Sequence, residues 1–276
     1  MNFTFRALSR EAGLAAEHIA SGVTALGKGN YAQPAYYAEA FFALSIGFER
    51  SAKLAIVVDH AMNHNGEFPS GHEIRQYGHN LRDLLAVTDR ISRRLAQTAT
   101  PSNCLPSTAI HKAIIDILND FATNVTRYYN LDVITWGAKV HQSDDPVKAW
   151  YERVTLPILD QHWRGASRSR AERDASIIAS RLGEYAIVSH QSESREPLDN
   201  IYAASFETGR AKAVAPYTRM YVLQIARFFC HLMSDLTFAS HKSLSENVPY
   251  LSEFFAIFNN DDAYFKRRRN WSIYKP

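Results

Sequence analysis

Apolar residues recur every three or four positions along most of the chain, which is the spacing of a helix with one buried face. The clearest example lies between residues 34 and 64. Its apolar positions are Phe41, Leu44, Phe48, Leu54, Val57 and Val58. We therefore expect one long helix here, which buries this face against a second helix that begins near Ile74.

The same spacing predicts helices over the rest of the chain. Residues 6–27 are rich in alanine and leucine, and the glycines of the following GKGN segment end that helix. After the turn NGEFPSG, one helix is expected to carry the apolar residues from Ile74 to Leu95. Further helices are expected at residues 107–130, 146–163, 168–189, 198–212, 216–241 and 247–258. No segment alternates like a strand, so the predicted fold class is all-α.

The segment LDVITWGAKVHQSDDP, residues 131–146, has no helical rhythm and is the best candidate for a domain boundary. Its final Asp-Asp-Pro suits the start of a helix, because aspartate caps helices and proline is tolerated in the first turn. We expect a helical bundle at residues 1–140 and a second helical region packed on it at residues 141–276.

Composition limits the class of protein. The chain has 276 residues, of which 46% are hydrophobic and 21% charged, with a net charge of +3. Only two cysteines are present, which excludes a disulfide scaffold and a cysteine-rich zinc module. The N-terminal residues lack a signal-peptide core, and Glu49, Arg50 and Lys53 interrupt the most apolar run. We expect a cytoplasmic protein that does not enter a membrane.

Histidines gather around the turn that follows the long helix. His60 and His64 are four residues apart, a spacing that two metal ligands on one helix face can use. Further ligands would come from Asp59, Glu67, His72 and His79. The metalloprotease pattern needs a glutamate directly after the first histidine, and Ala61 stands there. Histidine at a helix end also interacts favourably with the helix dipole, so we expect no tightly held metal and no cofactor.

Arg75 and His79 form the strongest catalytic candidate. In one helix, residues four apart lie on the same face, where both side chains can reach one reacting group. Histidine moves protons near neutral pH, and arginine stabilises phosphate charge, so the pair has the groups needed for metal-independent RNA cleavage. The alternative is structural, with Arg75 solvated and His79 packed at a helix start. Arg227 and His231 have the same spacing in an apolar helix, where a core role is the better interpretation.

The C-terminal tail mixes cations with aromatic residues. Cations pair with phosphates and aromatic faces stack on unpaired bases, so the mixture suits single-stranded RNA. The candidate RNA-binding residues are Lys266, Arg267, Arg268, Arg269, Trp271 and Tyr274. Two alternatives stay open, because the aromatic residues can instead hold the tail on the bundle, or the tail can bind a protein partner.

Two ordered motifs in the first half of the chain point to a known family. The helix AFFALSIGFERSAKLAIVV contains a Glu-x-x-x-Lys step at Glu49 and Lys53, and YGHNLRDLL follows after a turn, with Gly78, His79 and Leu81. RYYNLDVITWG follows as the end of such a bundle. Over about half of its length, the chain therefore resembles the prokaryotic HEPN-like helical domains of the Gly-His-x-Leu type.

This resemblance implies an RNA-directed protein, often a homodimer, and in many cases a metal-independent endoribonuclease of a toxin–antitoxin or anti-phage defence system. The family's catalytic arginine and histidine are separated by four to six residues, whereas only three separate Arg75 from His79. Domains of the Gly-His-x-Leu type can also be non-catalytic. The alternative function is therefore a sensing or scaffolding module that binds a protein partner.

Overall fold

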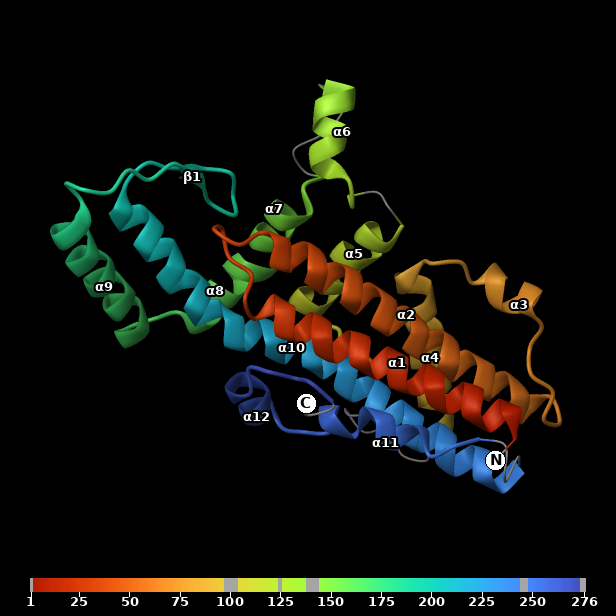
Figure 1. Cartoon of the computed structure of the whole chain (residues 1–276). Helices are drawn as coiled ribbons and strands as arrows, with labels where there is room; N and C mark the ends of the chain where they lie inside the picture. The colour runs from red at the N-terminus through yellow and green to blue at the C-terminus, as the bar shows by residue number, and fades with distance from the viewer. Residues whose placement is uncertain (1, 97–103, 124–125, 138–143, 244–247, 274–276) are drawn as a thin grey trace.

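The computed structural model describes residues 2–96, 104–123, 126–137, 144–243 and 248–273, which are helical over most of their length (Figure 1). The predicted all-α class is confirmed, since the described strands are two residues long each. No helix in these ranges is both long enough and apolar enough to span a lipid bilayer.

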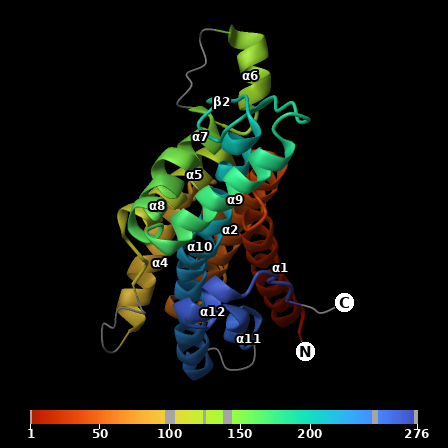
Figure 2. The same cartoon turned by 90° about the vertical axis from the view of Figure 1, so that its left-hand side faces the viewer.

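Three long helices form the centre of the molecule: α1 (Phe3–Leu26), α2 (Ala35–Asn63) and α10 (Ile201–Ser243) lie side by side (Figures 1 and 2). Two glycines allow α1 and α2 to approach closely. A Cβ atom on Gly22 would lie 2.6 Å from Leu44 Cγ, and one on Gly47 would lie 2.7 Å from Ile19 Cγ1. Side chains at either glycine would therefore force the two helices apart.

The long helix expected at residues 34–64 is confirmed, together with its principal core residues. Phe41, Leu44 and Phe48 are fully buried, and the Phe48 ring lies 6.0 Å from that of Phe229 in α10. Val57 is only partly buried and packs against the edge of the core. One continuous apolar core joins residues from both halves of the chain, while the division at residue 140 stays a prediction.

The single helix expected from Ile74 to Leu95 was a wrong prediction. The chain forms a short helix α3 (Gly71–Gln76) and a separate helix α4 (Leu81–Leu95). Gly78 between them has a φ of 56°, a left-handed conformation that glycine adopts without strain. Asn80 then caps α4 by accepting a hydrogen bond from Asp83 N.

The fourth predicted helix ends early, and the candidate boundary segment is itself partly helical. Helix α5 (Ala109–Ala122) ends before residue 130, and a separate helix α6 (Tyr129–Trp136) extends into the boundary segment, where no helix was expected. Helix α6 stands out from the rest of the molecule (Figures 1 and 2). Asp145 caps α7 (Pro146–Trp150), which confirms the helix start expected from Asp-Asp-Pro.

Helix α7 continues through a π-helical turn η4 (Tyr151–Thr155) into α8 (Leu156–His162), close to the expected span 146–163. Helix α9 (Ala166–Leu182) follows, and a small hairpin joins β1 (His190–Gln191) to β2 (Pro197–Leu198).

The two helices expected at residues 198–212 and 216–241 are one helix, α10, which runs through Pro216. An internal proline costs about 3 kcal/mol. The helix nevertheless continues, because the buried residues after Pro216, from Met220 to Leu236, pack against the core. The chain then forms α11 (Leu251–Phe255), the 3₁₀ turn η5 (Ala256–Phe258) and α12 (Asp262–Arg267).

Candidate functional site

His79 lies in the loop between α3 and α4 and contacts a carboxylate of α2. Its Nδ1 atom lies 2.9 Å from Glu49 Oε1. The His79 side chain is 72% exposed, whereas that of Glu49 is only 18% exposed. A largely buried carboxylate that accepts from Nδ1 selects the tautomer of the imidazole and leaves Nε2 directed away from that contact. This is how many enzymes orient a histidine that moves protons.

Lys53 completes this group, which we call the His79 site (His79, Glu49 and Lys53). Lys53 Nζ lies 2.8 Å from the same Glu49 Oε1 atom, one helical turn along α2. The Glu49–Lys53 step and the Gly-His motif, which are 30 residues apart, thus meet in space. The site contains an exposed imidazole and a cation, Lys53, whose side chain is 22% exposed.

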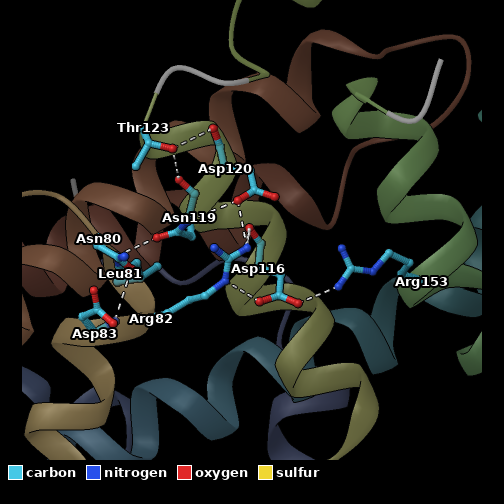
Figure 3. A network of polar contacts seen from close by, with 9 residues as sticks. All are labelled: Asn80, Leu81, Arg82, Asp83, Asp116, Asn119, Asp120, Thr123 and Arg153. Carbon is cyan, nitrogen blue, oxygen red and sulfur yellow. Dashed lines mark hydrogen bonds and ion pairs between the residues drawn. The ribbon is translucent and has the colours of Figure 1, made fainter. Parts of the chain in front are cut away.

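A network of polar contacts holds the start of α4, and with it His79, against α5 (Figure 3). The Leu81 N–H donates to Asn119 Oδ1 at 2.8 Å. Arg82 forms ion pairs with Asp116 at 2.6 Å and Asp120 at 2.8 Å. Because Leu81 and Arg82 follow His79 by only two and three residues, these contacts restrict where the imidazole can lie.

Asp116 is the centre of this network. Arg153 of η4 contacts its second carboxylate oxygen at 2.6 Å, so Asp116 lies between two guanidinium groups (Figure 3). Burial opposes its ionisation, but the hydrogen bonds from Arg82 and Arg153 outweigh that effect and hold the pKa of Asp116 below its usual range. The carboxylate therefore stays charged and keeps α4, α5 and η4 together.

Arg75 does not share a helix face with His79, contrary to the basis on which we paired them. Helix α3 ends at Gln76, and the left-handed Gly78 turns the chain before His79. Arg75 is exposed, and its Nε donates to the Gly71 carbonyl at 2.9 Å. Among the described residues, no hydrogen bond joins the two side chains.

The histidine-rich turn forms local contacts. The rings of His60 and His64 stack with centroids 3.8 Å apart, and His64 Nδ1 lies 2.8 Å from the His60 carbonyl oxygen. Asp59 pairs with Arg94 of α4. In the part of the chain that the structure describes, no three histidine, cysteine or acidic side chains are grouped to hold a metal ion. The expectation of no tightly held metal stays a prediction.

The C-terminal tail is docked on the bundle. Trp271 is fully buried, its backbone N–H donates to Thr24 Oγ1 of α1, and its ring lies 5.7 Å from that of Phe265. The Arg268 guanidinium lies 4.9 Å from the Trp271 ring centroid. A buried indole cannot stack on a base, so the expected role of Trp271 in binding RNA is not supported, and the docking alternative describes it better.

The remaining candidate residues of the tail differ from one another. Lys266 Nζ lies over the Tyr217 ring at 5.4 Å, while Arg267 and Arg269 are exposed. Tyr274 lies outside the described residues. The tail therefore offers two exposed guanidinium groups for phosphate contacts, beside an aromatic cluster that packs inward.

A cavity beside α6 was not predicted from the sequence. Its lining includes Thr126, Arg127, Asp145 and Arg195, which are up to 69 positions apart in the chain. Arg127 belongs to the RYYNLD stretch, whose cation and tyrosines were a usable signal. Nothing in the sequence links that stretch to Arg195.

Glu193 was also missed. This buried carboxyl accepts a hydrogen bond of 2.7 Å from the Tyr37 hydroxyl. Burial raises its pKa to about 7, and the charge of Glu207 adds to that effect, against the opposing Tyr37 hydrogen bond and Arg210 charge. Glu193 therefore changes protonation near neutral pH, although it is not part of the His79 site.

Comparisons of the chain with family models, with curated proteins and with solved structures find no match. The resemblance to HEPN-like domains therefore stays a prediction that rests on the motifs quoted above.

Proposed function

We propose that the protein is an RNA-directed helical protein that cleaves RNA without a metal ion, with His79 as the general acid/base. The observation that carries the proposal is the contact between His79 Nδ1 and Glu49, which fixes the orientation of an exposed imidazole. The resemblance to HEPN-like domains adds the setting, which we propose to be a toxin or anti-phage defence system.

The proposed reaction needs only groups of this chain and the RNA. His79 Nε2 removes the proton from a ribose 2′-hydroxyl, whose oxygen attacks the adjacent phosphorus. The bond from phosphorus to the 5′-oxygen breaks, and that oxygen takes a proton from the imidazolium or from water. Lys53 and the exposed Arg75 are the candidates for stabilising the phosphate charge, although Arg75 belongs to α3 and His79 to the loop that follows it. The products are a 2′,3′-cyclic phosphate and a 5′-hydroxyl.

The test is cleavage of single-stranded RNA by purified protein in the presence of EDTA, with product ends identified by mass spectrometry. His79→Ala should lower the rate about a hundredfold or more, since general acid/base catalysis contributes at least that much. Glu49→Gln should have a smaller effect, because it keeps the hydrogen bond but loses the charge. His72→Ala is the matched control, because His72 is also exposed and only six residues before Gly78. Equal rates for wild type and His79→Ala would refute the proposal.

A second candidate function, a scaffolding module for a protein partner, is favoured by α6. On this projecting helix, Leu131 is 59% exposed, Ile134 79% and Trp136 64%. Clustered exposed apolar side chains are a mark of protein interaction surfaces. In that case His79 holds the α3–α4 loop on α2, and His79→Ala changes stability without changing any RNA.

The oligomeric state tests whether the partner of α6 is a second copy of this chain. Light scattering on the wild type and on Ile134→Glu should show a dimer that the substitution dissociates, if a second copy covers α6. Thr135→Glu, on the same helix at an already polar position, is the control. A wild-type monomer would leave a different protein as the only partner for this face.

A further inference from the structure

The β1–β2 hairpin crosses from α9 and α10 toward the start of α7 (Figures 1 and 2). Its strands are two residues long each, and so short a ladder is not stable by itself. The residues that lead into it, 183–189, are exposed or half-buried and restrain it little. The position of the hairpin therefore depends on the contacts that its turn makes with the helices.

The central contact is made by Glu193, in the turn of the hairpin. The Glu193 carboxyl accepts a hydrogen bond of 2.7 Å from the Tyr37 hydroxyl of α2. Glu193 is 9% exposed and Tyr37 is 5% exposed, so solvent has little access to this hydrogen bond. An acidic side chain of a surface hairpin is thus inserted between the hairpin and the helical bundle.

Two further contacts hold the hairpin. Arg195 Nε pairs with Asp145 at the start of α7, and the His190 ring lies 5.8 Å from the Tyr31 ring. Arg195 has a φ of 71°, in the left-handed region that residues other than glycine rarely adopt. Strained residues of this kind persist only where the surrounding contacts hold them. The turn therefore keeps its conformation only while it is docked.

The titratable and charged groups that face Glu193 come from three elements: Tyr37 from α2, Tyr151 from η4, and Glu207 and Arg210 from α10. Arg210 is already engaged, because its Nη1 pairs with Glu207 at 2.6 Å and its Nη2 donates to the Tyr151 hydroxyl at 2.7 Å. Within the described ranges Glu193 forms no ion pair, and the group that donates to it is a neutral hydroxyl.

An ionised Glu193 would therefore be a buried charge without a paired cation, which is unfavourable. Burial raises the pKa of Glu193 in the docked hairpin to about 7, and the charge of Glu207 adds to that effect, against the opposing Tyr37 hydrogen bond and Arg210 charge. In a released hairpin the carboxyl is in water, where its pKa is 4.5. Docking is therefore strongest below pH 4.5, weakens as the pH rises to about 7, and is weakest above that value.

We propose that the β1–β2 hairpin is a pH-sensitive lid, docked on α2 while Glu193 carries its proton and released when Glu193 is ionised. The lid covers a hollow of about 500 Å³, whose lining on the side of the bundle includes Tyr31, Pro34 and Val147. Release of the hairpin uncovers this hollow. The lid depends neither on His79 nor on RNA cleavage, so it goes beyond the proposed function.

Hydrogen–deuterium exchange of the full chain, measured by mass spectrometry at pH 5 and pH 8, tests the lid. Each rate is divided by the intrinsic exchange rate at that pH. The Ser192 N–H donates to the Glu196 carbonyl at 2.8 Å and the Arg195 N–H to the Ser192 carbonyl at 3.0 Å, so these amides report on the docked turn. Their protection should fall on the order of a hundredfold from pH 5 to pH 8, since docking changes about tenfold per pH unit between the two pKa values. Peptides of α1 and α2 should keep their protection.

Two variants isolate the carboxyl, and a third is the matched control. Glu193→Gln keeps the hydrogen bond with Tyr37 but cannot ionise, so its hairpin should be as protected at pH 8 as at pH 5. Glu207→Gln removes the neighbouring negative charge and leaves Arg210 free to pair with an ionised Glu193, so its loss of protection should be smaller than that of the wild type. Glu196→Gln makes the same chemical change at an exposed position of the same turn, and it should behave like the wild type.

Histidine also changes charge between pH 5 and pH 8, and His190 belongs to the hairpin. His190→Gln should therefore keep the pH dependence of the wild type. Equal protection of the wild-type hairpin at both pH values would overturn the lid proposal, and so would a pH dependence that persists in Glu193→Gln or disappears in His190→Gln. An equal loss of protection in α1 and α2 would also overturn it, because the protein would then unfold as a whole.

Discussion

The C-terminal tail and the α6 end of the molecule differ in whether their aromatic side chains are buried or exposed. At the tail end, Trp271 and Phe265 are fully buried, and the Trp271 Nε1–H donates to the Arg268 carbonyl at 3.1 Å. At the α6 end, Trp136 is 64% exposed and Arg127 Nε lacks a hydrogen-bond partner among the described residues. Both segments combine cations with rings in the sequence. Both regions keep cations exposed, but only the α6 end also exposes its rings, Trp136 and Tyr128. Composition alone therefore does not identify a binding surface.

The largest expected effect tests whether the tail is structural. Trp271→Ala should lower the free energy of unfolding by about 3–5 kcal/mol, because it leaves a cavity among Phe258, Phe265 and Tyr264. Urea unfolding followed by circular dichroism measures this difference. Trp136→Ala, at the exposed α6 end, is the matched control, with an expected change below about 0.5 kcal/mol. Similar values for the two tryptophans would remove the contrast between the ends.

The second largest expected effect is a dependence of stability on pH, which comes from the buried carboxyl of Glu193. The pKa of Glu193 is about 7 in the folded state, against 4.5 for the free side chain, so between these values the folded protein holds more protons than the unfolded one. Stability should therefore fall as pH rises from about 4.5 to 7, by on the order of 3 kcal/mol from this group.

Glu193→Gln isolates that contribution, because glutamine keeps the hydrogen bond with Tyr37 but does not titrate. Urea unfolding of both proteins at pH 5 and pH 8 should show a smaller pH dependence for the variant. The neighbouring Glu207 and Arg210 pair at 2.6 Å and are unchanged in both proteins. An identical pH dependence in wild type and variant would show that Glu193 titrates normally.

A smaller effect, an increase in the free energy of unfolding, is expected for Thr126→Val. Thr126→Val replaces a buried hydroxyl that lacks a partner among the described residues with a methyl group of similar size. We expect a gain of about 1 kcal/mol in unfolding free energy, since the desolvation cost of the hydroxyl disappears. A loss of stability would mean that the hydroxyl is satisfied in solution.

The smallest effect on stability is expected at Arg267 and Arg269, which are exposed on the tail. Changing both to alanine should alter the unfolding free energy by less than about 0.5 kcal/mol. If they contact RNA phosphates, the log–log slope of binding against salt should become shallower by about 0.7 per lost contact. Filter binding at several salt concentrations measures the slope, and an unchanged slope would remove the tail from the RNA-binding surface.

Several elements were predictable because their signals are local. The three-to-four spacing in α2 gave the helix and its buried Phe41 and Phe48, and Asp145 before Pro146 marked the start of α7. The family resemblance singled out Glu49, Lys53 and the Gly-His motif, but it did not predict that they contact one another. Their contact distances required the fold.

Other elements depended on packing that no local signal contains. Two helices were predicted at residues 198–212 and 216–241, but they form one helix, α10, because the apolar residues after Pro216 pack against α2, α4 and α5. The predicted helix from Ile74 to Leu95 included Gly78. In the structure Gly78 has a left-handed conformation, and the α4 helix that follows it is held on α5 by the Leu81–Asn119 hydrogen bond.

By itself the sequence determined that the chain is all-α and where most helices begin, since capping and the periodicity of apolar residues act within a few positions. The tertiary structure decided which polar and aromatic groups are available. Trp271 meets α1 across 247 positions of the chain, and Arg195 meets Asp145 across 50. Such contacts arise from the mutual arrangement of distant elements, which is why the tail became part of the core and the cavity at the α6 end appeared only in the folded molecule.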